Sequence, residues 1–275
     1  MKKLIILVTG IAMGIAGHAQ SVSLYQGETE VMNCPTESID SIVFKSRAAT
    51  GTTPVAARPV NGHWCALGTS ITWYNENVSS QPVAGSFTRG YQSRVMDRLK
   101  FSQYSNQGVN GGVVKSAIDK VIRADYYTIE HGINDWAKNT AVGTIDDYIN
   151  NTNNGTFAAN YRVLIDKIYA TNPDAKIVLC TPRKAYGFNG FLPAHWYDPK
   201  HDNNTGKDIY LKDYVDIVRQ IAEYESLPLA DFFAECGAQH NLQRLSIDVA
   251  LHPNDAGYQL MANVLLQALE KTIVD

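Results

Sequence analysis

The sequence lacks a strong charge of either sign, and this excludes several kinds of partner. Its 24 lysines and arginines nearly balance 27 aspartates and glutamates, for a net charge of −3. A nucleic-acid partner requires a basic face, and an acidic tail requires a block of like charges. With 45% apolar residues over a length of 275, the chain has instead the composition of a packed globular protein with one large core.

Cysteine is also scarce. The chain has four, at Cys34, Cys65, Cys180 and Cys236, and no pair has the C-x-x-C spacing of a zinc site. Cys65 and Cys180 lie in apolar runs typical of strands, so we expect buried thiols there. An exported chain would allow a disulfide, but the spacing of these cysteines implies none.

The only long apolar run begins the chain. It follows Lys2 and Lys3, covers residues 4–16, and ends beside the small residues Gly17 and Ala19. This pattern is typical of a signal peptide cut after Ala19. A membrane anchor is the alternative, but the run is shorter than the ~20 residues that cross a bilayer. We therefore expect residues 1–19 to be a signal peptide, export to the periplasm or the exterior, and no stable membrane insertion.

The remaining chain divides into three segments. Residues 20–46 form an N-terminal β extension, with strands predicted at 21–25 and 38–44 around a turn at 33–35. Residues 47–60 are small and contain proline, which is typical of a linker. The main domain is expected to cover 61–275, and there is no internal repeat.

Strands and helices alternate in the main domain. We predict strands at 64–67, 101–107, 126–129, 176–180 and near 227–230, and helices at 112–123, 157–170, 209–224 and 256–269. Apolar strands without alternation, each followed by a helix, indicate an α/β fold with a parallel sheet covered on both faces. Such sheets carry their active sites at the carboxyl ends of the strands.

Polar residues follow three of these strands. Ser70 comes after Gly68 and Thr69, where it could be a nucleophile or simply a helix N-cap. The glycine-rich segment 106–112 could offer backbone N–H groups, but it lacks the ending of a phosphate-binding loop. Asn134, in Gly132-Ile-Asn-Asp135, could donate to an oxyanion or form an ordinary Asx turn.

A histidine completes the set. His252 precedes Pro253 and a predicted helix, and Asp248 lies four residues before it. Such a histidine can accept a proton from a serine hydroxyl, although a lone histidine is more often structural. Together these segments supply a nucleophile, a backbone donor, an amide donor and a base, which are the groups that acyl transfer requires.

In these segments the chain resembles the SGNH (GDSL-like) hydrolases, from about residue 62 to 268. The resemblance implies a three-layer α/β/α sandwich with a flavodoxin-like five-stranded parallel sheet, and ester hydrolysis without metal or cofactor. It implies Ser70 as nucleophile, His252 as base and Asp248 as its partner. The oxyanion donors would be the N–H groups of Ser70 and Gly111 and the amide of Asn134.

Two positions depart from the family pattern. Thr69 replaces the aspartate of Gly-Asp-Ser, which we expect to alter the support of the turn and to leave activity intact. Asp248 is one residue too far from His252, and Val249 stands in the usual aspartate position. Either Asp248 still reaches the imidazole, which we favour, or a main-chain carbonyl orients the ring.

Aromatic residues suggest the substrate. Trp73 and Tyr74 follow the nucleophile, and the long segment 183–207 contains Trp196. We expect these three to bind a small-molecule or polysaccharide ester, with an acyl or acetyl group on a carbohydrate. Alternatives are a lipid or thioester substrate, a non-catalytic carbohydrate-binding module, or a flavodoxin-like ligand-binding domain. A further alternative is a metal site, for which the candidate ligands are His195, Asp198, His201 and Asp202. We expect no metal there, because polar loop residues are more often solvated.

Overall fold

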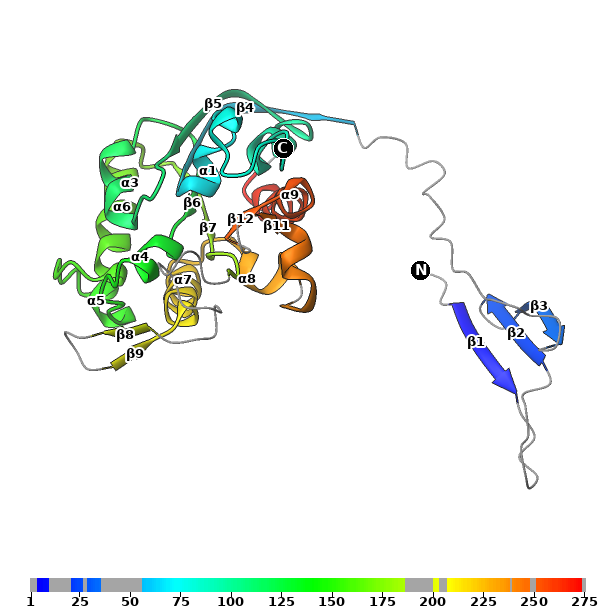
Figure 1. Ribbon diagram of the computed structural model, residues 1–275. Helices are drawn as coiled ribbons and strands as arrows, with labels where there is room; N and C mark the ends of the chain where they lie inside the picture. The colour runs from blue at the N-terminus through cyan, green and yellow to red at the C-terminus, as the bar shows by residue number, and fades with distance from the viewer. Residues whose placement is uncertain are drawn as a thin grey trace. The chain divides into compact units, whose positions relative to one another are not determined.

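The chain divides into two units, residues Met1–Pro54 and Val55–Asp275, which are described separately. The computed structural model describes residues 4–9, 21–26, 29–35, 56–185, 200–202, 207–237, 239–247 and 251–273 (Figure 1). No helix among these residues is long and apolar enough to span a bilayer.

The first unit contains a three-stranded antiparallel sheet in the order β1-β2-β3, formed by β1 (Leu4–Thr9), β2 (Ser21–Gln26) and β3 (Thr29–Pro35). β2 agrees with the predicted strand at 21–25. The predicted turn at 33–35 is wrong, because these residues end β3 and pair with β2. Pro35 is tolerated there because it ends an edge strand, where a missing N–H breaks no ladder bond. The predicted strand at 38–44 lies outside the described residues, and β1 falls within the predicted signal peptide.

The second unit is built on a five-stranded parallel sheet in the order β10-β7-β6-β4-β5. Its strands are β4 (Arg58–Gly68), β5 (Leu99–Gly108), β6 (Tyr126–Glu130), β7 (Lys176–Cys180) and β10 (Leu229–Ala230). Numbered along this unit, the order is 2-1-3-4-5, which is that of flavodoxin-like folds. The predicted fold class is confirmed. The order reverses between β4 and β6, and such switch points are where these sheets bind ligands.

Alternate residues of each strand enter two separate cores, one on each face of the sheet. In β4, Cys65 and Leu67 join the first core while Trp64 and Ala66 join the second. The first core is covered by α3 (Val114–Ala117), α4 (Ile133–Ala137), α5 (Ile145–Ile149), α6 (Phe157–Thr171) and α7 (Leu211–Glu225). The second is covered by α1 (Ser70–Trp73), α2 (Tyr91–Met96), α8 (Phe232–Glu235) and α9 (Asp255–Glu270). Figure 1 shows α6 and α9 on opposite sides of the sheet, so the unit is a three-layer sandwich.

The remaining elements are short. They comprise the 3-10 helices η2 (Val78–Ser80), η3 (Ile118–Lys120) and η4 (Gln239–Leu245), and the strand pairs β8 (Lys200–Asp202) with β9 (Lys207–Ile209) and β11 (Ser246–Ile247) with β12 (His252–Pro253).

Two predicted boundaries differ from the structure by several residues. The helix predicted at 112–123 is only α3 followed by η3, and Val121 is already extended (φ −66°, ψ 118°), because the chain must turn into β6. β4 begins at Arg58, inside the predicted linker. Pro59 is accommodated there because β6 pairs with β4 only from Trp64 onward, which leaves one side of β4 without a neighbouring strand at this point.

Candidate active site

A sharp turn from β4 into α1 presents Ser70. Thr69 is the N-cap of α1, and its hydroxyl accepts a hydrogen bond from the Ile71 N–H at 3.3 Å. Ser70 is the first helical residue, so its own N–H has no partner within the helix. The turn requires glycine before it, since a Cβ on Gly68 would lie 2.0 Å from Thr72 Oγ1. The same serine therefore offers a hydroxyl and a backbone donor at the carboxyl end of β4.

The structure brings Ser70 and His252 together across 182 positions of sequence. Ser70 Oγ lies 2.9 Å from His252 Nε2, and each residue is 7% exposed. His252 lies in β12, just before α9 with its N-cap Asn254, so the start of that helix holds the histidine in place. With its proton on Nδ1, a neutral imidazole in this position accepts the serine proton through Nε2.

Tyr74 supports this histidine. Its ring meets the His252 ring edge-on, with centroids 5.2 Å apart and an interplanar angle of 88°. Tyr74 is only 4% exposed and also packs against Phe87. The sequence predicted Tyr74 as a substrate-binding residue on an aromatic rim. The structure places this residue in the second core against the imidazole, and a role in binding substrate stays a prediction.

Hydrogen bonds join the segments that carry the predicted oxyanion donors, whose role stays a prediction. The loop after β5 is tied to it by a hydrogen bond from Val109 N–H to the Gly68 carbonyl (2.9 Å). Gly111 has φ +69°, a conformation that favours glycine. Asn134 Nδ2 donates to the carbonyl of Gly112 at 3.0 Å, which places the amide against the glycine loop. An amide nitrogen carries two hydrogens, so Asn134 retains a second donor.

Asn134 owes its position to the turn from β6 into α4. Gly132 is the N-cap of α4 with φ +129°, and a Cβ there would lie 3.0 Å from Pro182 Cγ. Asp135 follows, and its two carboxylate oxygens each lie 3.2 Å from the Val114 N–H at the start of α3. Burial raises the pKa of Asp135 to about 7. This carboxyl therefore joins α4 to α3, the helix that follows the glycine-rich segment 106–112.

The sequence analysis missed Glu130, the last residue of β6. Its side chain is fully buried, and Oε2 accepts from the Thr69 hydroxyl (2.7 Å), the Thr69 N–H (3.2 Å) and the Thr72 hydroxyl (3.3 Å). Burial raises the pKa of Glu130 to about 7. The available signal was a carboxylate ending an otherwise apolar strand directly before His131. His131 is also fully buried, which lowers its pKa to about 3 and keeps the ring neutral.

Of the other predicted site residues, one lies within the described part of the chain and two lie outside it. Trp73 is partly exposed and lines a pocket beside α1. Asp248 and Trp196 lie outside the described residues, so a contact between Asp248 and His252 stays a prediction, as does a role for Trp196. His195 and Asp198 lie outside them as well. Within the part of the chain that is described, no group of three or more histidine, cysteine, aspartate or glutamate side chains is arranged to hold a metal ion.

Known structures share this architecture. A protein from Chitinophaga pinensis described as a possible lipase is 25% identical, with a TM-score of 0.63 over 77% of this chain and 98% of its own. A protein from Lactobacillus plantarum is 20% identical, with a TM-score of 0.60 over 79% and 98% of the two chains. A GDSL-like lipase from Parabacteroides merdae is 19% identical, with a TM-score of 0.52 over 78% and 98%.

Comparison with curated proteins found no match. The model of the GDSL-like Lipase/Acylhydrolase family matches residues 66–260, which include Ser70, Gly111, Asn134 and His252. The predicted family is thus confirmed: the chain belongs to the GDSL-like lipase/acylhydrolase family and is a hydrolase that acts on ester bonds.

Proposed function

We propose that this protein is an exported serine esterase in which Ser70 attacks the ester carbonyl and His252 is the general base. The distance of 2.9 Å between Ser70 Oγ and His252 Nε2 carries the proposal. It is within the reach that proton transfer from a nucleophile to its base requires. Both groups lie at the carboxyl end of β4, beside the switch point of the sheet.

The reaction proceeds in two halves. As Ser70 Oγ bonds to the carbonyl carbon, its proton passes to His252 Nε2, and the carbonyl oxygen becomes an oxyanion. The N–H groups of Ser70 and Gly111 and the Asn134 amide donate to this oxygen. Collapse of the intermediate breaks the ester bond, and the leaving alcohol takes the proton from His252. A water molecule then hydrolyses the acyl-serine with His252 again as base. Asp248 orients the imidazole through Nδ1.

The substrate is an ester of a carbohydrate, with an acetyl or other acyl group on a sugar hydroxyl. Trp73 supports this proposal because a partly exposed indole three residues after the nucleophile suits stacking against a sugar ring. The N-terminal run with Lys2 and Lys3 supports export. The alternatives are a lipid acylhydrolase or thioesterase with the same site.

Hydrolysis of p-nitrophenyl acetate by the wild type and by Ser70→Ala tests the proposal, together with labelling by a fluorophosphonate probe. We expect turnover and labelling by the wild type and neither by the variant. Equal labelling of both proteins would place the nucleophile elsewhere. No turnover of this ester or of an acylated-saccharide panel by the wild type would leave a non-catalytic carbohydrate-binding module as the better interpretation.

A further inference from the structure

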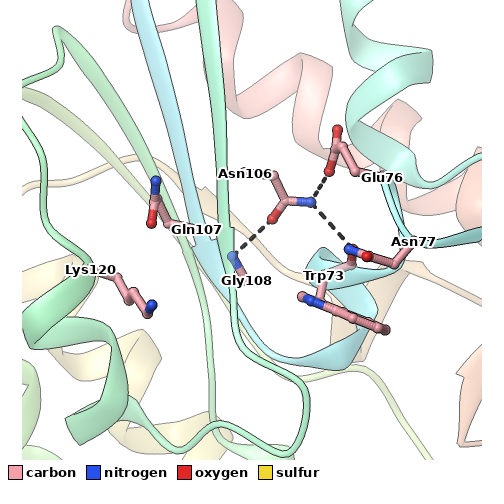
Figure 2. Close-up of a pocket in the computed structure, with 7 residues that line it drawn as sticks. All are labelled: Trp73, Glu76, Asn77, Asn106, Gln107, Gly108 and Lys120. Atoms are coloured by element: carbon pink, nitrogen blue, oxygen red, sulfur yellow. Dashed lines mark hydrogen bonds between the residues drawn. The ribbon is translucent and has the colours of Figure 1, made fainter. Parts of the chain in front are cut away.

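A pocket of about 310 Å³ lies beside α1, the helix that begins at Ser70 (Figure 2). Its walls come from three segments: α1 and the residues after it, the end of β5, and η3. The lining residues are Trp73, Glu76, Asn77, Asn106, Gln107, Gly108 and Lys120. Figure 2 shows Gln107 and Lys120 on one side of the β5 ribbon and Asn106, Glu76 and Asn77 on the other.

Two of the three segments that line the pocket also carry candidate catalytic residues or lead into them. Trp73 follows Ser70 by three positions in α1, a spacing that places two side chains on one face of a helix. Helical side chains lean toward the N-terminus, which directs the indole toward the serine end of α1. On the other wall, Gly108 ends β5 three residues before Gly111. The pocket therefore begins about one helical turn from the candidate nucleophile.

Hydrogen bonds hold these walls in place. Asn106 Nδ2 donates to the carbonyl of Thr72 at 2.8 Å and also bonds Glu76 Oε2, while Asn106 Oδ1 accepts from the Gly108 N–H at 2.8 Å. Asn77 Nδ2 donates to the Trp73 carbonyl at 2.9 Å. Because both amides bind backbone groups, the pocket exists before any ligand enters it.

Glycine is required at position 108, where β5 passes close to α1. A Cβ on Gly108 would lie 2.4 Å from the Trp73 nitrogen, so β5 and α1 can approach this closely only without a side chain there. The side chains of Gln107 and Lys120 make no hydrogen bond or ion pair with any other residue that the structure describes. Their polar ends are thus available to a ligand.

The lining decides which part of an ester fits. It contains one indole, three amides, one carboxylate and one ammonium group, and no aliphatic side chain. An acyl chain would gain little apolar contact in this lining and could not pair with the Gln107 amide or the Lys120 ammonium group. A sugar ring has apolar C–H groups that pack on an indole and hydroxyls that pair with amides. Glu76 and Lys120 carry opposite charges, which favours a ring with no net charge.

We propose that this pocket binds the neutral sugar ring bearing the ester, so that it selects the alcohol part of the substrate rather than the acyl part. The inference rests on the proposed function, because it takes Ser70 as the point of attack. It assigns Trp73 as the stacking platform and Gln107 and Lys120 as hydroxyl-binding groups.

The kinetic test compares Trp73→Ala and Gln107→Ala with the wild type on acetylated xylo-oligosaccharides and on p-nitrophenyl acetate. The control variant is Tyr224→Ala, which removes another exposed aromatic residue, 52% exposed, from α7. For Trp73→Ala we expect kcat/KM on the saccharide ester to fall about tenfold relative to the value on p-nitrophenyl acetate, mainly through KM, because stacking is lost. Trp73→Phe should recover part of this loss, and the control should keep the wild-type ratio.

Binding is measured separately from hydrolysis, by calorimetric titration of unacetylated xylo-, cello- and manno-oligosaccharides into Ser70→Ala and into Ser70→Ala/Trp73→Ala. We expect weaker binding of at least one of these sugars by the double variant. An unchanged ratio in the kinetic test, or equal binding by the two proteins, would overturn the subsite. A selective loss on p-nitrophenyl octanoate would also overturn it, since the pocket would then hold the acyl chain. Lack of all turnover by the wild type, with sugar binding retained, would contradict the esterase mechanism and leave the pocket standing.

Discussion

Glu130 holds Thr69, the residue just before the nucleophile, by two hydrogen bonds to a single carboxylate oxygen. The Thr69 hydroxyl donates at 2.7 Å and its N–H at 3.2 Å. The family pattern has aspartate at position 69, and an aspartate there would face Glu130 as a second buried acid. Threonine instead supplies a donor. The departure at position 69 is thus matched by the residue that ends β6.

The first prediction concerns this support. Glu130→Leu keeps the approximate size of the side chain but removes the oxygen that accepts from both Thr69 and Thr72. We expect kcat for p-nitrophenyl acetate to fall about tenfold with little change in KM, because weaker anchoring displaces Ser70 after binding. Glu235→Leu, on the exposed end of α8, is the matched control. A kcat within twofold of wild type would mean that Glu130 does not position the nucleophile.

The second prediction concerns pH and stability. The pKa of Glu130 is raised from 4.5 to about 7 in the folded protein. Between these values the folded state binds more protons than the unfolded chain, so the contribution of Glu130 to stability falls as pH rises through this window. Asp135 acts in the same direction, and His131 acts oppositely, since its lowered pKa makes stability rise between about pH 3 and 6.5.

Glu130→Gln isolates one of these contributions. The free energy of unfolding, measured in urea at pH 4.5 and pH 8, should decrease less between the two values in the variant than in the wild type. The difference should be up to about 3 kcal/mol, because one unit of pKa shift corresponds to about 1.4 kcal/mol. The same decrease in both proteins would contradict a raised pKa at Glu130.

The third prediction tests the amide donor. Asn134→Ala removes a side chain that already lies against the glycine loop, so the oxyanion loses one donor while the substrate still binds. We expect kcat to fall ~100-fold to 1,000-fold with a small effect on KM. Asn263→Ala, an exposed asparagine of α9, should behave as wild type. A change in KM alone would assign Asn134 to binding rather than to the transition state.

The fourth prediction separates the two ways of orienting His252. If Asp248 accepts from Nδ1, Asp248→Asn should lower kcat by a factor on the order of 10⁴, since the wrong imidazole tautomer is then favoured. If a main-chain carbonyl takes this role, the variant should retain most of the wild-type rate. The pH dependence of kcat, measured for both proteins, shows whether the substitution has changed the protonation of the general base His252.

The main elements were predictable because their patterns are local. Uniformly apolar runs such as Lys176–Cys180 indicated buried parallel strands, and the apolar face of α6 was readable from its helical spacing. The break of the predicted helix at 112–123 was not readable, because it depends on where β6 must begin. Trp73 and Tyr74 both follow the nucleophile closely in the sequence, and only the packing of the fold decided that Tyr74 faces the core.

The sequence by itself determined the family, the α/β class and the candidate groups Ser70, Gly111, Asn134 and His252, because the order and spacing of its motifs place polar residues at strand ends. Only the tertiary structure decided that Ser70 Oγ lies 2.9 Å from His252 Nε2 and that Glu130 accepts a hydrogen bond from Thr69. It also decided that Trp73 and Gln107 border one polar pocket. The reason is physical: these contacts join segments far apart along the chain, and their geometry follows from sheet order and core packing, which no local pattern contains.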